Sequence, residues 1–336
     1  MARRIKRFAN YPLATATFIQ LLRDYNEDAL NSDLSQAFSG HMKTLDTDKK
    51  ITKSLLNNFD KIPSRFKRNV LRDIGRLNLT KGSENDMRAR LTIPMAMYVS
   101  DDDVDLNPPP EFPLDTKFRI EYTGLYCKDS QGDWGWFGGS DEPYAVINAV
   151  HINIDADVGE MNVVTTTSHP VSDTSEHYNN VDDGTVKKGP VAAIWEGELN
   201  GVSLLSTLME HDSDNIQEIK KGIELIVKGV AWILSVWGYP IPPTVQDWIS
   251  DLLNWLMPTG DDLLGEATYF ITPEWMRRFA AYPEDPIYSG TDLPYHFTTV
   301  HNKDGNYVLT YRVKADKAPV GPGVILSPPV LSVITN

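Results

Sequence analysis

The chain has one cysteine, Cys127, among its 336 residues, and it has no long apolar run. A single cysteine excludes a disulfide within the chain and a metal site built from several cysteines. The longest nearly uncharged apolar run, residues 229–237, is about half of the roughly 20 residues that a membrane-spanning helix needs. The sequence therefore predicts a fold that does not depend on an oxidising compartment, and no transmembrane anchor.

The sequence also lacks the apolar core of a secretory signal. Basic residues occur among the first seven positions, but Asn10, Pro12 and Arg23 interrupt the segment that follows. We therefore expect a cytosolic location, or release without a classical signal peptide. Peripheral attachment to a membrane is compatible with either expectation.

The composition is that of a globular protein, and its charge is unevenly spread. Hydrophobic residues make up 41% and charged residues 23%, with a formal net charge of −14. Residues 1–90 contain 18 Lys and Arg against 10 Asp and Glu, whereas the remainder contains 14 against 36. This asymmetry predicts two parts with different partners.

Residues 1–88 are predicted to form a helical module. Apolar residues recur there at helical spacing and indicate four helices. The fourth helix has a basic face that could contact phosphates of lipid or nucleic acid, formed by Arg65, Lys67, Arg68, Arg72 and Arg76. Because no base-reading motif accompanies these charges, a solvated helix face is favoured and nucleic acid is not the expected partner.

Residues 89–114 are predicted to form an edge strand and a proline-rich linker. Apolar residues alternate over residues 91–99, and Pro94 restricts this strand to a sheet edge. Three aspartates and the prolines at 108–110 then form a stiff, acidic segment. We expect a domain boundary near residue 105.

Residues 115–315 are predicted to be mainly β, as an eight-stranded antiparallel β-sandwich. Short strands are separated by Gly, Pro, Asp and Asn, at about 117–127, 144–154, 160–168, 190–198, 202–210, 266–272, 295–301 and 307–315. Phe118, Ile120 and Tyr122 alternate with polar residues, as in a strand with one buried face. The proline-rich tail, 316–336, is expected to be extended over the surface.

Two amphipathic helices, within residues 216–257, interrupt this β series and are predicted to form an inserted αα-hairpin. The hairpin has two interpretations. As a membrane-active element it would place four tryptophans at the lipid interface, Trp232, Trp237, Trp248 and Trp255. As structural cover, its apolar stripes would pack against each other and against the sandwich.

Two acidic loops are the candidate functional site. One covers residues 129–144, and the other is divided by the hairpin into residues 210–214 and 260–267. Oxygen ligands from loops at one end of a sandwich suit calcium, which takes six to eight oxygens, better than magnesium with its strict octahedron. A bound cation would also relieve the repulsion between the carboxylates. The alternative is that they are solvated turn residues at strand ends.

Three short motifs carry a resemblance to a known family. Ser140-Asp141-Glu142-Pro143-Tyr144 is similar to the Ser-Asp-Pro-Tyr loop of C2 domains, the calcium-and-lipid-binding β-sandwich family, with Glu142 inserted. Glu210-His211-Asp212 resembles their acidic strand end, and residues 261–265 resemble the Asp-x-x-Gly that follows it. Trp195 precedes a strand, as a tryptophan often does in that family. The resemblance covers about residues 115–315.

The resemblance implies a calcium site and a function. Its implied ligands are Asp129, Asp141, Glu210, Asp212 and Asp262. The chain departs from the family in its longer first loop, in Glu210 where aspartate is usual, and in the hairpin that replaces a short calcium loop. The expected function is calcium-dependent attachment to an anionic membrane surface or a protein partner, with a toxin-like effector role by analogy.

Two alternatives remain open, a metal-independent structural or adaptor protein and a hydrolase that uses the acidic cleft. The chain has no nucleophile elbow, no phosphate-binding glycine loop and no paired-histidine metal helix. His169, His177 and His211 could join nearby acids in a hydrolytic site, but no spacing specifies one. Cys127 is expected to be packed rather than nucleophilic. The sequence therefore leans against an enzyme.

Overall fold

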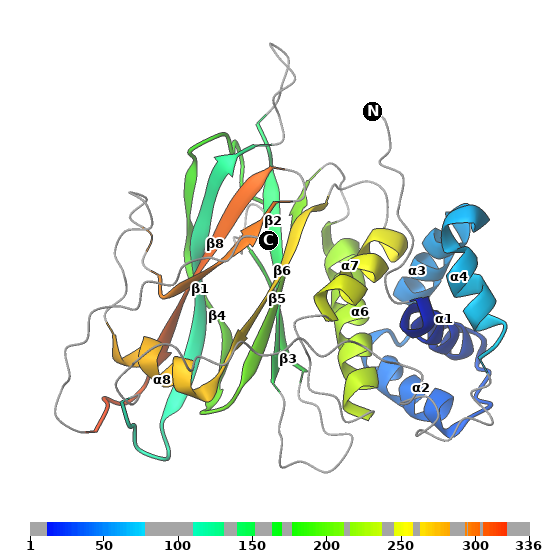
Figure 1. Cartoon of the computed structure of the whole chain (residues 1–336), viewed down its shortest axis with the longest axis horizontal. Coiled ribbons are helices and arrows are strands. Elements are labelled where there is room, and N and C mark those ends of the chain that lie inside the picture. Colours follow the sequence, from blue (N-terminus) through cyan, green and yellow to red (C-terminus); the bar gives the residue numbers. More distant parts are fainter. Residues whose placement is uncertain are drawn as a thin grey trace. The chain divides into compact units, whose positions relative to one another are not determined.

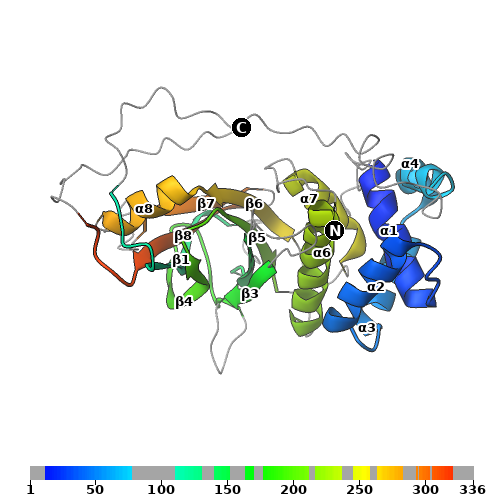
Figure 2. The same cartoon turned by 90° about the horizontal axis from the view of Figure 1, so that it is seen from below.

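A computed structural model of the chain shows two compact units (Figures 1 and 2). The structure describes residues 12–77, 110–130, 140–151, 163–169, 177–211, 216–236, 245–257, 263–282, 293, 295–302 and 305–320. One unit, called the helical unit below, contains α1 to α4, α6 and α7. The other, called the β unit, contains all eight described strands and α8.

The helical unit begins with four helices at the positions that the apolar spacing predicted. They are α1 (Pro12–Glu27), α2 (Asp33–Leu45), α3 (Lys50–Lys61) and α4 (Ser64–Ile74). Helix α2 begins after Ser32, whose hydroxyl accepts a hydrogen bond from the backbone N–H of Ser35 at 3.0 Å. The Asp46 carboxylate likewise accepts from the N–H groups of Ile51 and Thr52, and so satisfies otherwise unpartnered donors in the first turn of α3.

Two later helices, α6 (Ile216–Val236) and α7 (Val245–Leu256), complete the core of this unit. Helix α6 packs on α2 and α3, and α7 packs on α3 and α1. The rings of Phe38 and Trp232 meet edge to face at 5.4 Å, and the Asn58 amide donates to the Leu256 carbonyl at 3.0 Å. The expectation that these helices pack on each other and on the sandwich missed their main partner, because their apolar stripes are buried against the N-terminal helices.

A glycine in α6 shows how close this packing is. A Cβ atom added at Gly229 would lie 2.7 Å from the Phe18 ring, which is shorter than any ordinary carbon contact. Glycine is therefore required where α6 crosses Phe18 of α1, although it lowers the intrinsic helix propensity of α6.

The β unit consists of two four-stranded antiparallel sheets (Figure 1). Its strands are β1 (Lys117–Asp129), β2 (Pro143–His151), β3 (Val163–His169), β4 (Val186–Glu198), β5 (Val202–Glu210), β6 (Leu263–Ile271), β7 (Phe297–His301) and β8 (Asn306–Ala315). The sheet orders are β4-β1-β8-β7 and β3-β2-β5-β6. The prediction of eight antiparallel strands in this unit is confirmed. The description "mainly β" is not confirmed for the whole chain, because the described residues have mixed α and β content.

Buried side chains from both sheets form one core. It includes Ile120 and Tyr122 from β1, Ile147 from β2, and Leu204 and Leu208 from β5. Burial of such side chains is the main favourable contribution to the stability of a two-sheet arrangement. The two sheets therefore stabilise each other through a shared apolar layer.

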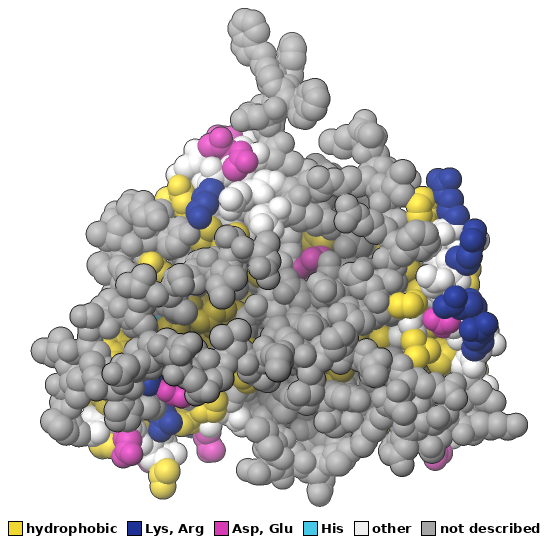
Figure 3. Space-filling model, in the orientation of Figure 1, with side chains coloured by type: hydrophobic (Ala, Val, Ile, Leu, Met, Phe, Trp, Pro, Cys, Tyr) yellow, Lys and Arg dark blue, Asp and Glu magenta, His cyan; other side chains and the backbone are white. Residues whose placement is uncertain are grey.

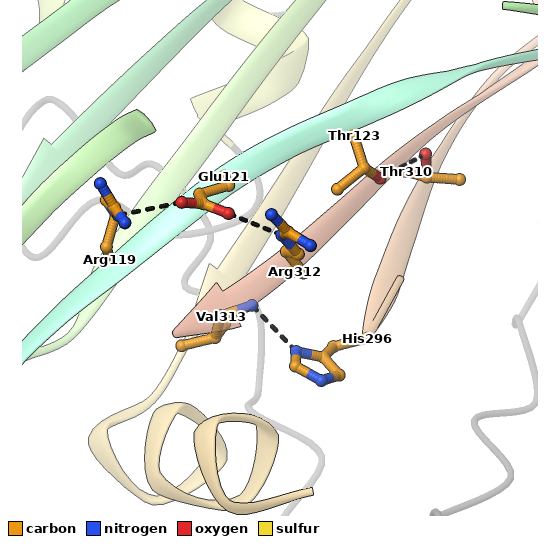
Figure 4. A network of polar contacts seen from close by, with 7 residues as sticks. All are labelled: Arg119, Glu121, Thr123, His296, Thr310, Arg312 and Val313. Atoms are coloured by element: carbon orange, nitrogen blue, oxygen red, sulfur yellow. Dashed lines mark hydrogen bonds and ion pairs between the residues drawn. The ribbon is translucent and has the colours of Figure 1, made fainter. Parts of the chain in front are cut away.

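The polar face of β1 is more buried than its alternating pattern predicted. Glu121 is buried, and its carboxylate lies 2.9 Å from Arg119 Nε and 2.6 Å from Arg312 Nε (Figure 4). The Thr123 hydroxyl donates to Thr310 Oγ1 at 2.8 Å in the same row. These residues are tolerated because each polar group has a partner within the protein.

Helix α8 (Pro273–Ala281) was not predicted from the sequence. It follows β6 directly and lies beside β8 in both views (Figures 1 and 2). The Thr272 hydroxyl caps it by accepting from the Trp275 N–H at 3.2 Å, and Pro273 occupies its first turn. Threonine followed by proline is a helix-start signal that could have located this helix.

None of the described helices is both long and apolar enough to cross a membrane.

The burial of Trp255 generates a stability prediction. Its side chain is 2% exposed and contacts Phe59 of α3, with ring centroids 6.1 Å apart. Trp255→Ala is expected to lower the free energy of unfolding of the helical unit by about 3–5 kcal/mol, because it leaves a cavity. Urea unfolding followed by far-UV circular dichroism measures the change.

Lys53→Ala is the control, because Lys53 is exposed on α3 and its replacement is expected to change this free energy by less than about 0.5 kcal/mol. Equal unfolding curves for Trp255→Ala and Lys53→Ala would contradict the assignment of α7 to this core.

Candidate metal centre

Strand pairing brings the predicted acidic segments to one end of the β unit. Pro143 at the start of β2 pairs with Glu210 at the end of β5, and Met209 of β5 pairs with Leu263 at the start of β6. The two described flanks of the divided loop are therefore neighbours, although two helices lie between them in the sequence. The Tyr307 hydroxyl of β8 donates to the carboxylate of Asp141, which brings this end of the other sheet to the same place.

Asp141 is part of the core at this end of the unit. It is 1% exposed, and its backbone exchanges two hydrogen bonds with Val181, at 3.1 and 3.0 Å. Its neighbour Cys127 is fully buried, and burial, assisted by the charges of Asp141 and Asp183, raises the pKa of the Cys127 thiol to about 12. The prediction that Cys127 is packed is confirmed. Asp141, predicted as a calcium ligand, is directed to Tyr307 instead of to solvent.

The other predicted calcium ligands are only partly described. Asp129 is exposed at the end of β1, and Glu210 is half-buried at the end of β5. Asp212 and Asp262 lie outside the described residues. Within the described ranges, Asp129, Asp141 and Glu210 are not gathered closely enough to share one ion. The five-residue calcium site therefore stays a prediction.

The described residues contain a different group that could hold a metal ion, formed by Glu142, His177 and His211. One potential ligand atom from each lies within 4.8 Å of the other two. Nε2 of His177 lies 3.4 Å from Glu142 Oε2. The two imidazole rings are stacked, with centroids 4.4 Å apart and planes inclined by 27°. The three residues are called the His-Glu group below.

Backbone hydrogen bonds position the His-Glu group. Glu142 directly precedes β2, and its carbonyl accepts from the N–H of His211, which directly follows β5, at 3.1 Å. The N–H of Tyr178, next to His177, donates to the Pro143 carbonyl at 2.8 Å. Three segments that are distant in sequence are thus joined through their main chains, and the side chains can rotate without losing these bonds.

Sequence reasoning missed the His-Glu group. Glu142 was interpreted only as an insertion in a family motif, and His177 and His211 were noted without a shared partner. The signal lies in the register of β2 with β5, because pairing of Pro143 with Glu210 places the preceding Glu142 opposite the following His211. That register depends on packing and could not be read from spacing. His169, the third histidine noted, lies on β3, and only its backbone is described.

A second polar cluster, centred on His301, is buried in the β unit. His301 Nε2 lies 3.1 Å from the Ser206 hydroxyl and 3.2 Å from the Thr299 hydroxyl, which lies 3.1 Å from the Tyr311 hydroxyl. Ser206 and His301 are both fully buried. Burial lowers the pKa of His301 to about 4, so its imidazole is neutral at pH 7. This arrangement is a polar part of the core and does not present a serine nucleophile to solvent.

The predicted membrane contacts lie mainly in the helical core. Trp248 is 0% and Trp255 is 2% exposed, and Trp232 is half-buried between Phe38 and His41. Trp237 lies outside the described residues. Lipid contact by Trp248 or Trp255 would require either side chain to leave this core, so their membrane role stays a prediction that the conformation does not favour.

The basic face of α4 is narrower than the sequence suggested. Three arginines of α4 are exposed, Arg65, Arg68 and Arg72, as is Arg76 just after the helix ends, and Figure 3 shows a row of basic side chains on this part of the surface. Lys67 is buried, and its ammonium donates to the carbonyls of Phe59 and Asp60 at 2.6 and 3.1 Å. Burial lowers the pKa of Lys67. Lys67 therefore caps the end of α3 instead of extending the basic face.

Comparison with known proteins does not assign a family. No protein-family model matches the sequence, and no curated protein matches it. The resemblance to C2 domains therefore stays a prediction that depends on its three short motifs.

The buried His301 generates a pH prediction. Its folded-state pKa of about 4 lies below the unfolded value near 6.5, so between these pH values the unfolded chain binds more protons. The free energy of unfolding is therefore expected to fall by about 3 kcal/mol as the pH is lowered through this window. Urea unfolding at a series of pH values measures the slope.

His301→Gln keeps hydrogen-bonding atoms near Ser206 but does not titrate, so it is expected to flatten this slope. His177→Gln, at a partly exposed position, is the control. An unchanged slope in His301→Gln would show that another group is responsible.

Proposed function

We propose that the β unit is a calcium-dependent module that attaches the protein to an anionic membrane surface. The proposal includes its classification as a C2-like β-sandwich in which α6 and α7 are an insertion between two loop flanks. The observation that carries it is the pairing of Met209 with Leu263. This pairing keeps the two flanks of the acidic loop together in spite of the insertion.

The charge of the chain gives calcium a necessary role in this proposal. Residues 91–336 contain 14 Lys and Arg against 36 Asp and Glu, so an anionic surface repels this part of the protein in the absence of a cation. A calcium ion held by loop carboxylates can complete its six to eight oxygen ligands with lipid phosphates. The ion then provides the attraction that the protein surface lacks.

Within the proposed site the carboxylates have unequal roles. Asp129 is exposed and could ligate directly, and Glu210 lies next to the paired flanks. Asp212 and Asp262 would complete the set. Asp141 holds the loop base through Tyr307, so we assign it a supporting role in which it ligates only if that hydrogen bond is released.

The alternatives receive less support. A toxin-like effector role would use the hairpin tryptophans, of which Trp248 and Trp255 are buried. A hydrolase with a serine or cysteine nucleophile would need that side chain to face solvent, whereas Ser206 and Cys127 are buried. A metal-independent structural or adaptor protein is the interpretation that remains if calcium has no effect.

Co-sedimentation with anionic phospholipid vesicles tests the attachment. The full chain is expected to sediment with vesicles in millimolar calcium and to stay in solution with a chelator. Asp129→Asn and Asp212→Asn each remove one ligand charge and are expected to raise the calcium concentration required by about tenfold or more. Glu196→Gln removes a charge from an exposed position on β4 and is the matched control. Equal sedimentation with chelator and with calcium contradicts the proposal.

The thermal midpoint tests calcium binding without a membrane. A ligand at about 100 times its dissociation constant, bound only to the folded state, adds about 2.7 kcal/mol to the free energy of unfolding. Calcium in this excess is therefore expected to raise the midpoint, and magnesium is expected to raise it less. An unchanged midpoint in calcium would leave the metal-independent interpretation.

A further inference from the structure

We propose that Glu142, His177 and His211 form a binding site for a first-row transition-metal ion of the zinc class. This site is separate from the calcium ligands and goes beyond the proposed function. The C2 resemblance does not imply it, because Glu142 is the residue inserted in the family motif and His177 belongs to none of the three motifs.

The donor set determines the class of metal. Two imidazoles and one carboxylate provide borderline nitrogen donors, which suit zinc, copper, nickel and iron. Calcium and magnesium prefer oxygen ligands in larger number. Two histidines and one glutamate also make up the ligand set of a well-known class of zinc sites that leave one position for water. The chemistry of this group therefore favours a transition metal over the hard cations.

The geometry lies within reach of coordination. Ligands that are 2.0–2.1 Å from a tetrahedral zinc ion are separated by about 3.4 Å. The potential ligand atoms of the His-Glu group lie within 4.8 Å of one another, so side-chain movements of about 1.4 Å or less bring them to that separation. Main-chain hydrogen bonds hold Glu142 to His211 and Tyr178 to Pro143, so the backbone can stay in place while the side chains adjust.

The hydrogen bonding of the imidazoles leaves donor atoms for a metal. Nδ1 of His177 and Nδ1 of His211 are buried and have no hydrogen-bond partner, which is costly for a polar atom in the absence of a ligand. Nε2 of His177 lies 2.9 Å from Asn179 Oδ1. When Nε2 carries the proton it donates to Asn179 Oδ1, as metal-bound histidines commonly do to an outer partner, and the lone pair lies on Nδ1. In the other tautomer the lone pair lies on Nε2, which is 3.4 Å from Glu142 Oε2.

The exposure of the group leaves access for the ion and for a further ligand. The side chains of His177 and Glu142 are 19% and 43% exposed. A fourth position could therefore be taken by water or by a group of a binding partner. The ion would also link three segments at this end of the β unit, because Glu142 precedes β2, His177 lies in the segment before Val181, and His211 follows β5. It would thereby stabilise the loops at this end.

Isothermal titration of the metal-free full chain with zinc chloride tests this proposal. One equivalent of zinc is expected to bind and to raise the thermal midpoint, and millimolar calcium is not expected to compete. Glu142→Gln, His177→Gln and His211→Gln are each expected to weaken zinc binding by at least about 10–100-fold, the loss that removing an outer-shell partner alone can cause. Glu142→Gln is the most conservative of the three, because glutamine has nearly the same size and shape as glutamate and lacks only its charge.

Further variants separate coordination from folding. Glu196→Gln, the charge-matched control, is expected to bind zinc like the unmodified chain. Asn179→Ala is expected to weaken zinc binding without changing its stoichiometry. Cobalt bound in place of zinc is expected to give a visible absorption spectrum, and the two histidine variants are expected to lose it. Thermal midpoints without metal show whether each variant is folded.

The result that would overturn the proposal is zinc binding that is absent, or that is equally strong in all three folded variants. Vesicle sedimentation in calcium, repeated with His177→Gln, distinguishes the two proposals. If His177→Gln loses zinc binding but still sediments with vesicles in calcium, the two sites are independent. If Asp129→Asn loses sedimentation but still binds zinc, that substitution has removed only the calcium site.

Discussion

The pairing of β5 with both of its neighbours is the constraint on which the loop end of the β unit depends. Its residues from Val202 to Met209 are buried, and it lies between β2 and β6 with a continuous register on each side except at its last pair with β6. A slip of one residue would turn every side chain to the opposite face, so burial fixes the register strongly. That register places Glu142 beside His211 and the start of β6 beside Met209.

The insertion between β5 and β6 shows how one connection can serve two cores. Helices α6 and α7 leave the sheet after β5, contribute apolar side chains to the helical unit, and are followed by β6. The entropy cost of closing a loop rises only slowly with its length, so a long insertion between paired strands lowers the stability of the sheet only slightly. Burial of the stripe residues against α1, α2 and α3 provides the compensating free energy. The folding of α6 and α7 is therefore tied to the N-terminal helices.

Buried polar groups in the β unit are distributed so that structure and binding use different residues. Glu121 with Arg312, Asp141 with Tyr307, and Ser206 with His301 have their partners inside the protein. Such pairs are costly to break, because each would leave an unpartnered group in a low-dielectric environment. The His-Glu group differs, since its members are partly exposed and two of its nitrogens have no partner. A ligand from solution is the simplest way to satisfy them.

The sequence by itself determined the type and position of most elements. Apolar periodicity located four N-terminal helices, the eight strands and the two later helices, because it reports which face of each element is apolar. It did not report what covers that face, so the packing of α6 and α7 on the N-terminal helices was decided only by the tertiary structure. The same holds for Asp141 and Lys67, whose charges suggested solvent but whose polar atoms have partners in the core. The His-Glu group likewise exists only in the tertiary structure, because strand register joins Glu142 to His211, about 70 positions apart, and a backbone hydrogen bond from Tyr178 to Pro143 positions His177.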